Sequence, residues 1–141
     1  MVAATPPAPS AEATSASPAE AFWRGLARGE LLAQICRSCR QRCFPARSRC
    51  PDCLSADLDE LPLSGRGDLH SWTLVRRGGR EMETPYVLGL IDLAEGLGRL
   101  VAPIAGVEGA AAEVLLRIGM PVRVGCRRDA AGAVRYCLRL D

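Results

Sequence analysis

Five of the seven cysteines of this 141-residue chain lie between Cys36 and Cys53. Cys36 and Cys39 form one Cys-x-x-Cys pair, and Cys50 and Cys53 form a second pair after an interval of ten residues. A tetrahedral thiolate site needs four sulfurs, and each such pair can present two of them from one tight turn. The spacing therefore predicts a four-cysteine metal site, in preference to disulfides or free thiols.

The identity of the metal is a choice between zinc and iron, since both accept four thiolates. The segment carries five arginines against a single carboxylate, Asp52, and this positive charge offsets the negative charge of a zinc tetrathiolate. An electron-transfer iron centre usually has apolar shielding, so zinc is favoured and iron is the alternative. Because four protein ligands leave no open coordination position, we expect the metal to stabilise a module too small for a core of its own.

The remaining cysteines need separate interpretations. Cys43 lies between the two pairs and could replace a ligand, act as a reactive thiol, or be a small apolar residue beside Phe44. The last interpretation is favoured, because free cysteine usually behaves as a buried apolar side chain. Cys126 and Cys137 fall on the last two predicted strands and are interpreted as core or sheet residues.

Side chains able to catalyse a reaction are few. His70 is the only histidine, and its place in an alternating segment favours a polar surface position. Asp92 and Glu95 could form a carboxylate pair, but Gly96 and Gly98 follow them and favour a turn. The sequence contains no nucleophile elbow, phosphate loop or dinucleotide fingerprint. We therefore predict a binding or assembly module with no catalytic residue.

The segment before the cysteines predicts a tail and a helix. Residues 1–16 are rich in Ala, Pro, Ser and Thr and are expected to form a disordered tail. Residues 17–29 predict an N-terminal helix, in which Ser17 and Glu20 match a capping box and Gly29 is a natural terminator.

An apolar face runs along this predicted helix. Phe22 and Leu26 are four residues apart and Trp23 lies beside them, as expected for one face of a helix. The face could pack on its own domain, or it could anchor the chain in a groove of another protein. The sequence leaves these two interpretations open.

The rest of the chain divides into the cysteine module, residues 30–62, and a mostly β region, residues 63–141. Apolar runs and alternating segments in the second region predict five short strands, at 69–75, 86–93, 98–106, 122–126 and 134–140. A short helix, 110–117, is predicted between the third and fourth strands. The fold class is therefore mainly β, and the element order favours a five-stranded Greek-key barrel of the OB type over a short β-sandwich.

The composition limits the classes of partner. The 18 basic residues, all arginine, and the 16 acidic residues give a net charge of +2, which offers no support for nucleic-acid binding. Hydrophobic residues make up 48% and charged residues 24%, as in globular proteins. The sequence shows no apolar run of the roughly 20 residues that a membrane span needs and no secretory signal, so we expect a cytoplasmic protein.

Five segments, taken in order, carry a resemblance to a known family: FWRGLARGELLAQICRSC, FPARSRCPDC, GRGDLHSWTLV, PYVLGLIDLAEG and IGMPVRV. Together they resemble the family catalogued as domain of unknown function thirty-five, whose members join an N-terminal helix, a rubredoxin-like zinc ribbon and a C-terminal OB fold. The resemblance covers about Ala21 to Asp141. One departure is Arg40, at a position where the family usually has glycine; a left-handed conformation there would cost about 1 kcal/mol.

The resemblance implies a non-catalytic accessory subunit that docks on a thiolase-like enzyme, or on a related acyl-CoA aldolase or hydratase, and helps to form its acyl-CoA site. It also implies zinc ligation by the two cysteine pairs. The helix signature of the family corresponds to Phe22, Trp23, Gly25 and Leu26. Its OB-domain signature corresponds to Pro85, Tyr86, Asp92, Glu95 and Gly96.

The candidate contacts with acyl-CoA or with the partner are Phe22, Trp23, Leu26, Arg47, Arg49, Trp72 and Tyr86. In this hypothesis Arg47 and Arg49 meet the phosphates of coenzyme A. The alternative function is binding of single-stranded nucleic acid. OB folds and zinc ribbons both bind nucleic acids, and the arginines between Cys36 and Cys53 could contact phosphates. The barrel offers only Trp72, Tyr86 and Tyr136 for base stacking, which disfavours nucleic acid.

Overall fold

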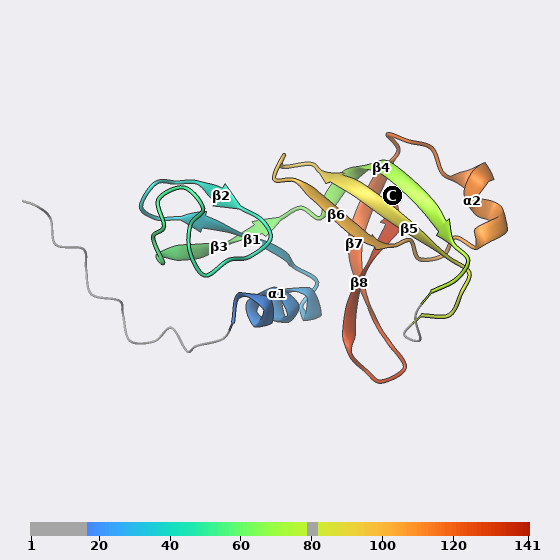
Figure 1. The fold of residues 1–141 in the computed structure, drawn as a ribbon, viewed down its shortest axis with the longest axis horizontal. Coiled ribbons are helices and arrows are strands. Elements are labelled where there is room, and N and C mark those ends of the chain that lie inside the picture. Colours follow the sequence, from blue (N-terminus) through green and yellow to red (C-terminus); the bar gives the residue numbers. More distant parts are fainter. Residues whose placement is uncertain (1–16, 79–81) are drawn as a thin grey trace, which may run out of the picture.

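Two β-sheets and two short helices make up the part of the chain that the computed structural model describes, residues 17–78 and 82–141 (Figure 1). The predicted tail, 1–16, lies outside the described residues. The elements are α1 (Pro18–Ala27), β1 (Leu31–Cys36), β2 (Arg42–Cys43), β3 (Leu58–Leu63), β4 (Arg66–Val75), β5 (Tyr86–Leu93), β6 (Arg99–Pro103), α2 (Gly109–Leu115), β7 (Pro121–Arg128) and β8 (Val134–Leu140). Neither helix is long and apolar enough to cross a bilayer.

Helix α1 begins and ends as its sequence predicts. The Ser17 hydroxyl accepts a hydrogen bond from the Glu20 backbone at 3.3 Å, and the Glu20 carboxylate accepts one from the Ser17 backbone at 2.8 Å. Gly29, just past the helix, has a φ of +80°. The capping box and the helix are therefore confirmed, and the last helical residue is Ala27.

The first sheet holds the cysteine module and has the order β2-β1-β3. All its pairings are antiparallel, and β1 pairs with β3 from Leu31 opposite Leu63 to Cys36 opposite Leu58. Strand β3 was not predicted, because Pro62 interrupts its pattern. The structure accommodates Pro62 because β3 is an edge strand, where a missing backbone donor is tolerated.

The second sheet has the order β6-β5-β4-β7-β8 and curls into a nearly closed barrel. Its outer strands meet where Ile104, just past β6, bridges to Leu138 of β8, and the backbone of Ala105 donates to the Leu138 carbonyl at 2.8 Å. The predicted OB-type barrel is confirmed, with α2 between the third and fourth of its strands. Strand β4 begins at Arg66, earlier than expected, and β6 ends at Pro103.

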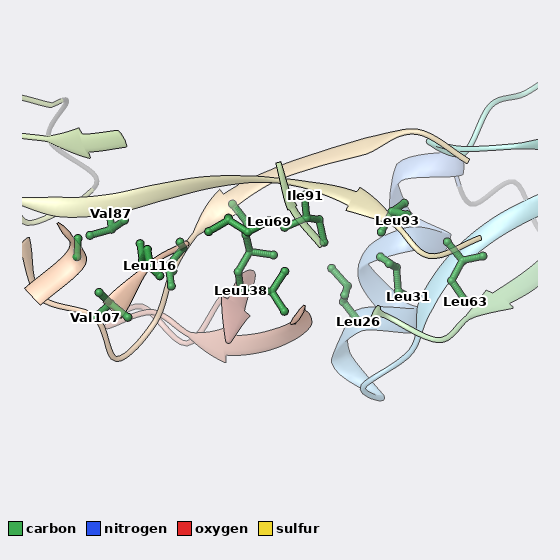
Figure 2. Packing of buried hydrophobic residues seen from close by; sticks show 14 of the residues in the cluster. Leu26, Leu31, Leu63, Leu69, Val87, Ile91, Leu93, Val107, Leu116 and Leu138 are labelled. Carbon is green, nitrogen blue, oxygen red and sulfur yellow. The ribbon is translucent and has the colours of Figure 1, made fainter. Parts of the chain in front are cut away.

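One hydrophobic cluster serves both sheets and α1. Leu69, Ile91 and Leu138 are fully buried inside the barrel. Figure 2 shows that the same cluster continues toward Leu26 of α1 and Leu31 of β1. The first sheet ends at Leu63 and the second begins at Arg66, close to the predicted boundary at 62/63, but the two parts do not have separate cores.

Candidate functional site

The two cysteine pairs converge on one point at the end of the first sheet. Their four sulfurs, those of Cys36, Cys39, Cys50 and Cys53, lie within 4.8 Å of one another. The Cys36 and Cys53 sulfurs are 3.6 Å apart, and those of Cys39 and Cys50 are 3.5 Å apart. Zinc–sulfur bonds of about 2.3 Å place tetrahedral sulfurs roughly 3.8 Å apart, so the four cysteines fit a tetrathiolate metal site.

The two Cys-x-x-Cys turns, Cys36 to Cys39 and Cys50 to Cys53, are called knuckles below, and their backbones have the same hydrogen-bond pattern. Arg40 donates from its backbone to the Cys36 carbonyl at 2.9 Å, and Leu54 donates to the Cys50 carbonyl at 3.1 Å. Arg40 and Leu54 both have left-handed backbone, with φ of 65° and 62°. The backbone is therefore strained at both residues, by about 1 kcal/mol each, and Arg40 is the position at which the sequence comparison expected glycine.

The thiols of the cluster do not ionise independently. The backbone N–H of Cys39 is the main cause that lowers the pKa of the Cys36 thiol to about 6. At Cys39 the Gln41 backbone N–H acts in the same direction, but burial and the adjacent thiols outweigh it and raise the pKa to about 12. The Cys36 thiol therefore loses its proton more readily than an ordinary thiol, whereas the raised pKa values of Cys39 and Cys53 favour their neutral forms in the absence of a bound cation.

The arginines around the knuckles have different partners. Arg37 makes a two-pronged contact with the Asp59 carboxylate, both distances being 2.6 Å, and this contact lowers the pKa of Asp59. Arg49 donates to the Leu54 carbonyl at 3.1 Å and so supports the second knuckle. Arg47 is exposed. Of the two arginines predicted to meet phosphates, Arg49 thus has a role inside the ribbon.

Cys43 is not one of the four clustered cysteines. Its side chain is buried, its sulfur lies 3.7 Å from the Gln34 carboxamide oxygen, and burial raises its pKa. Cys137 is fully buried and Cys126 is half-buried. These positions agree with the interpretation of all three as packing residues.

An aromatic cluster joins α1, the ribbon and the barrel. The Phe22 ring lies 6.2 Å from Phe44 of the ribbon and 6.1 Å from Tyr136 of β8. Trp23 stacks on Tyr136, with ring centres 5.6 Å apart. Leu26 is only 2% exposed and is therefore not available for an external contact. Most of the apolar face of α1 packs on its own chain, whereas Trp23 keeps 36% of its surface exposed.

A cleft of about 370 Å³ opens beside Trp23, between the β7–β8 hairpin and the outer surface of β5 and β6. Trp23 and Tyr136 form one wall, and apolar side chains of β5 and β6 form the floor. Arg127 and Arg135 line it from the two strands of the hairpin. The volume lies within the roughly 300–1,000 Å³ of small-molecule sites.

The seven candidate contact residues do not form a single site. Trp72 packs against the core from β4, and Tyr86 lines a different cleft beside α2. Of the seven, only Trp23 lines the cleft described above. Sequence reasoning missed Arg127 and Arg135, which are opposite each other only through the register of the β7–β8 pairing.

The acidic residues considered for catalysis have separate structural partners. Asp92 accepts from Arg99 at 2.6 Å and lies 2.8 Å from the His70 Nδ1, and the Arg99 hydrogen bond is the main cause of its lowered pKa. Glu95 instead accepts from the Ser64 backbone at 2.7 Å. His70 is the extra residue of a β-bulge in β4. No serine, threonine or cysteine side chain within the described residues hydrogen-bonds to this histidine.

Comparison with known proteins gives two adjacent family matches. Residues 23–59 match the rubredoxin-like zinc ribbon domain of ChsH2, and residues 60–127 match the C-terminal OB-fold domain of ChsH2. The chain is 37% identical over 107 residues to the benzoylsuccinyl-CoA thiolase subunit BbsA of Thauera aromatica, covering 74% of this chain and 72% of the relative.

Two further relatives extend this comparison. The chain is 35% identical over 104 residues to a probable enoyl-CoA hydratase alpha subunit of Thermomonospora curvata; the match covers 72% of this chain but only 31% of that relative. Among solved structures, a chain of the Ltp2-ChsH2(DUF35) aldolase superposes with a TM-score of 0.74 at 26% identity. This superposition covers 91% of the present chain and 97% of the solved one.

Proposed function

Because the chain belongs to the DUF35 family, with the zinc ribbon and OB-fold domains of ChsH2, we propose that it is an accessory subunit of an acyl-CoA-processing enzyme. It docks on a thiolase-like subunit, or on a related aldolase or hydratase, and helps to form the acyl-CoA site there. The similarity to a thiolase subunit over 72% of that relative's length carries this proposal. Relatives from an aldolase and a hydratase support the wider class.

The side chains of the site support a role without catalysis by this chain. The four clustered cysteines fit a closed metal site, which has no open position for a substrate. The carboxylates of Asp92 and Glu95 are held by separate partners and do not form an acid–base pair. The carbon–carbon or hydration chemistry therefore belongs to the partner.

The metal in this proposal is zinc with a structural role. Its ligands are the cysteines of the two knuckles, and the exposed arginines around them suit a charged thiolate centre better than an electron-transfer iron site. None of the seven cysteines forms a disulfide, which suits a reducing, cytoplasmic location. Elemental analysis of protein purified without added metal should give one zinc per chain. The absorption of an iron tetrathiolate in the visible range would contradict this assignment.

Docking is tested by co-expressing the chain with a candidate thiolase-like subunit and measuring thiolysis of an acyl-CoA with and without it. We expect a complex that is stable through size-exclusion chromatography and a partner that loses activity when purified alone. Full activity of the partner alone, with no complex formed, would refute the proposed function.

A further inference from the structure

Two arginines face each other across the β7–β8 hairpin without full compensation of their charge. The strand register sets Arg127 directly opposite Arg135, and like charges in that relation destabilise a sheet. Asp129 lies 3.2 Å from the Arg135 guanidinium and compensates one of them. Among residues 17–78 and 82–141, no carboxylate lies within 4 Å of the Arg127 guanidinium. The pair therefore leaves a positive charge at the edge of the cleft.

The same cleft exposes apolar surface next to this charge. Val101 on β6 is 48% exposed, and Leu88 on β5 is the register partner of Pro103. These three residues line the cleft floor, and the stacked Trp23 and Tyr136 rings form its wall. Asp129 compensates Arg135 and leaves the charge of Arg127, so the cleft places exposed apolar surface next to a positive charge, and this combination suits a ligand with both apolar and anionic parts.

We propose that this cleft binds an organic phosphate that carries an apolar arm. Arg127 and Arg135 take the phosphate, because guanidinium groups bind phosphate oxygens through paired, charge-assisted hydrogen bonds. The arm lies along Leu88, Val101 and Pro103, against the Trp23 ring. Coenzyme A thioesters have this chemistry, and naming them as the ligand rests on the proposed function. The site differs from the predicted phosphate contacts at Arg47 and Arg49, which belong to the ribbon.

Coenzyme A itself is the probe, and Trp23 is the reporter. The chain has two tryptophans, so Trp72→Phe leaves Trp23 as the single source of indole fluorescence. Titration of the full zinc-loaded chain should change this fluorescence saturably. The double variant Arg127→Ala/Arg135→Ala should weaken the affinity at least about tenfold, as expected for loss of charged hydrogen bonds. Pantetheine, which keeps the arm but lacks the phosphates, should bind more weakly by a similar factor.

Two variants make the test specific. In Asp129→Asn the side-chain oxygen can still accept hydrogen bonds from the backbones of Ala131 and Ala133. The substitution removes the negative charge that competes with the phosphate for Arg135. The affinity for coenzyme A should therefore rise a few-fold. The double variant Arg47→Glu/Arg49→Glu should leave affinity unchanged. A cooperative thermal transition and one zinc per chain would confirm that each variant is folded.

Two results would overturn the site. One is the absence of a saturable signal with coenzyme A, and the other is an equal loss in the Arg47/Arg49 variant and the Arg127/Arg135 variant. Both outcomes leave the proposed docking function standing, because that function is judged by complex formation with the partner subunit. Conversely, binding of coenzyme A at the cleft with no complex would support the site and count against docking.

Discussion

Replacing Gly25 with alanine tests how closely α1 is fitted to the ribbon. A Cβ atom at this position would lie 2.6 Å from Leu32 Cδ1, 2.7 Å from Leu32 Cγ and 3.1 Å from the Glu30 carbonyl oxygen. Leu32 is itself only 4% exposed, so its side chain has little room to move aside. The added methyl group must therefore push α1 away from β1.

The size of the effect follows from two opposing contributions. Alanine is favoured over glycine inside a helix by about 1 kcal/mol. Overpacking of a filled interior costs about 1–3 kcal/mol, and the upper half of that range applies because a side chain and a backbone carbonyl obstruct the methyl group together. We expect a net loss of about 1–2 kcal/mol in the free energy of unfolding. For a chain of this length that lowers the melting temperature by about 3–7 °C.

Thermal unfolding at saturating zinc, followed by circular dichroism, measures this loss. The control is Leu32→Ala, which makes room for the methyl group. Gly25→Ala introduced into the Leu32→Ala background should cost clearly less, because only the Glu30 carbonyl still limits the methyl group and helix propensity favours alanine. An equal loss in both backgrounds would refute the contact argument, and so would no loss in the native background. Gly29→Ala provides a comparison in which only backbone strain acts, because φ is +80° and no atom lies within 4 Å of the new Cβ.

Three further predictions concern the metal, the core and acid stability. Cys50→Ser should abolish stoichiometric zinc binding, measured by elemental analysis, because a fully buried ligand is lost; full zinc retention would contradict the ligand set. Leu69→Ala should lower the free energy of unfolding in urea by about 2–5 kcal/mol, because Leu69 is fully buried in the barrel. Hydrogen bonds from the Ala133 backbone N–H and then from Arg135 lower the pKa of the Asp129 carboxyl in the folded protein. The carboxylate of Asp129 therefore stabilises the fold above the pKa of an aspartate in the unfolded chain, about 4. This stabilisation is lost as the pH falls through the lower pKa of folded Asp129. Asp129→Asn should therefore flatten the loss of urea midpoint between about pH 5 and 2, and an unchanged slope would contradict this.

The features that sequence predicted well are local. Ser17 and Glu20 are three residues apart, so the capping box needs only the helix that it begins. The YVLGLIDL segment became β5 over its predicted range, because an apolar run suits a strand that buries the residues of one face and half-buries those of the other. The features that it missed depend on pairing with distant strands. Pro62 lies in a strand only because β1 is beside it, and His70 forms a bulge only in relation to β5.

The same distinction applies to the candidate sites. In each knuckle the two cysteines are three residues apart, so the sequence alone indicates the metal site, and the structure brings the four sulfurs together. The cleft is assembled from α1, β5, β6 and the two strands of the hairpin, so no local pattern indicates it. Choosing contacts by residue type selected Trp72, whose side chain packs against the core. It omitted Arg135, whose importance comes from its cross-strand partner Arg127.

The metal site and the cleft are joined by a chain of contacts, and this leads to a last prediction. Phe44 lies between the knuckles and contacts Phe22, which in turn contacts Trp23 and Tyr136 at the cleft wall. Without metal the segment from 36 to 53 loses the ligation that organises it, and Phe44 loses its fixed position. Trp23 fluorescence in the Trp72→Phe variant should therefore change when a chelator removes zinc.

The barrel provides the internal control for this prediction. The pairings of the barrel strands do not involve the cysteine turns, and the barrel interior is filled by Leu69, Ile91 and Leu138. Amide protons of β4, β5 and β8 should therefore still exchange slowly after chelation. Those of β1 and β2 should exchange faster. Re-addition of zinc should restore both the fluorescence and the protection of β1. Unchanged Trp23 fluorescence in fully zinc-free protein would show that the cleft wall is held by α1 and the barrel alone. The metal would then stabilise the ribbon without influencing the cleft.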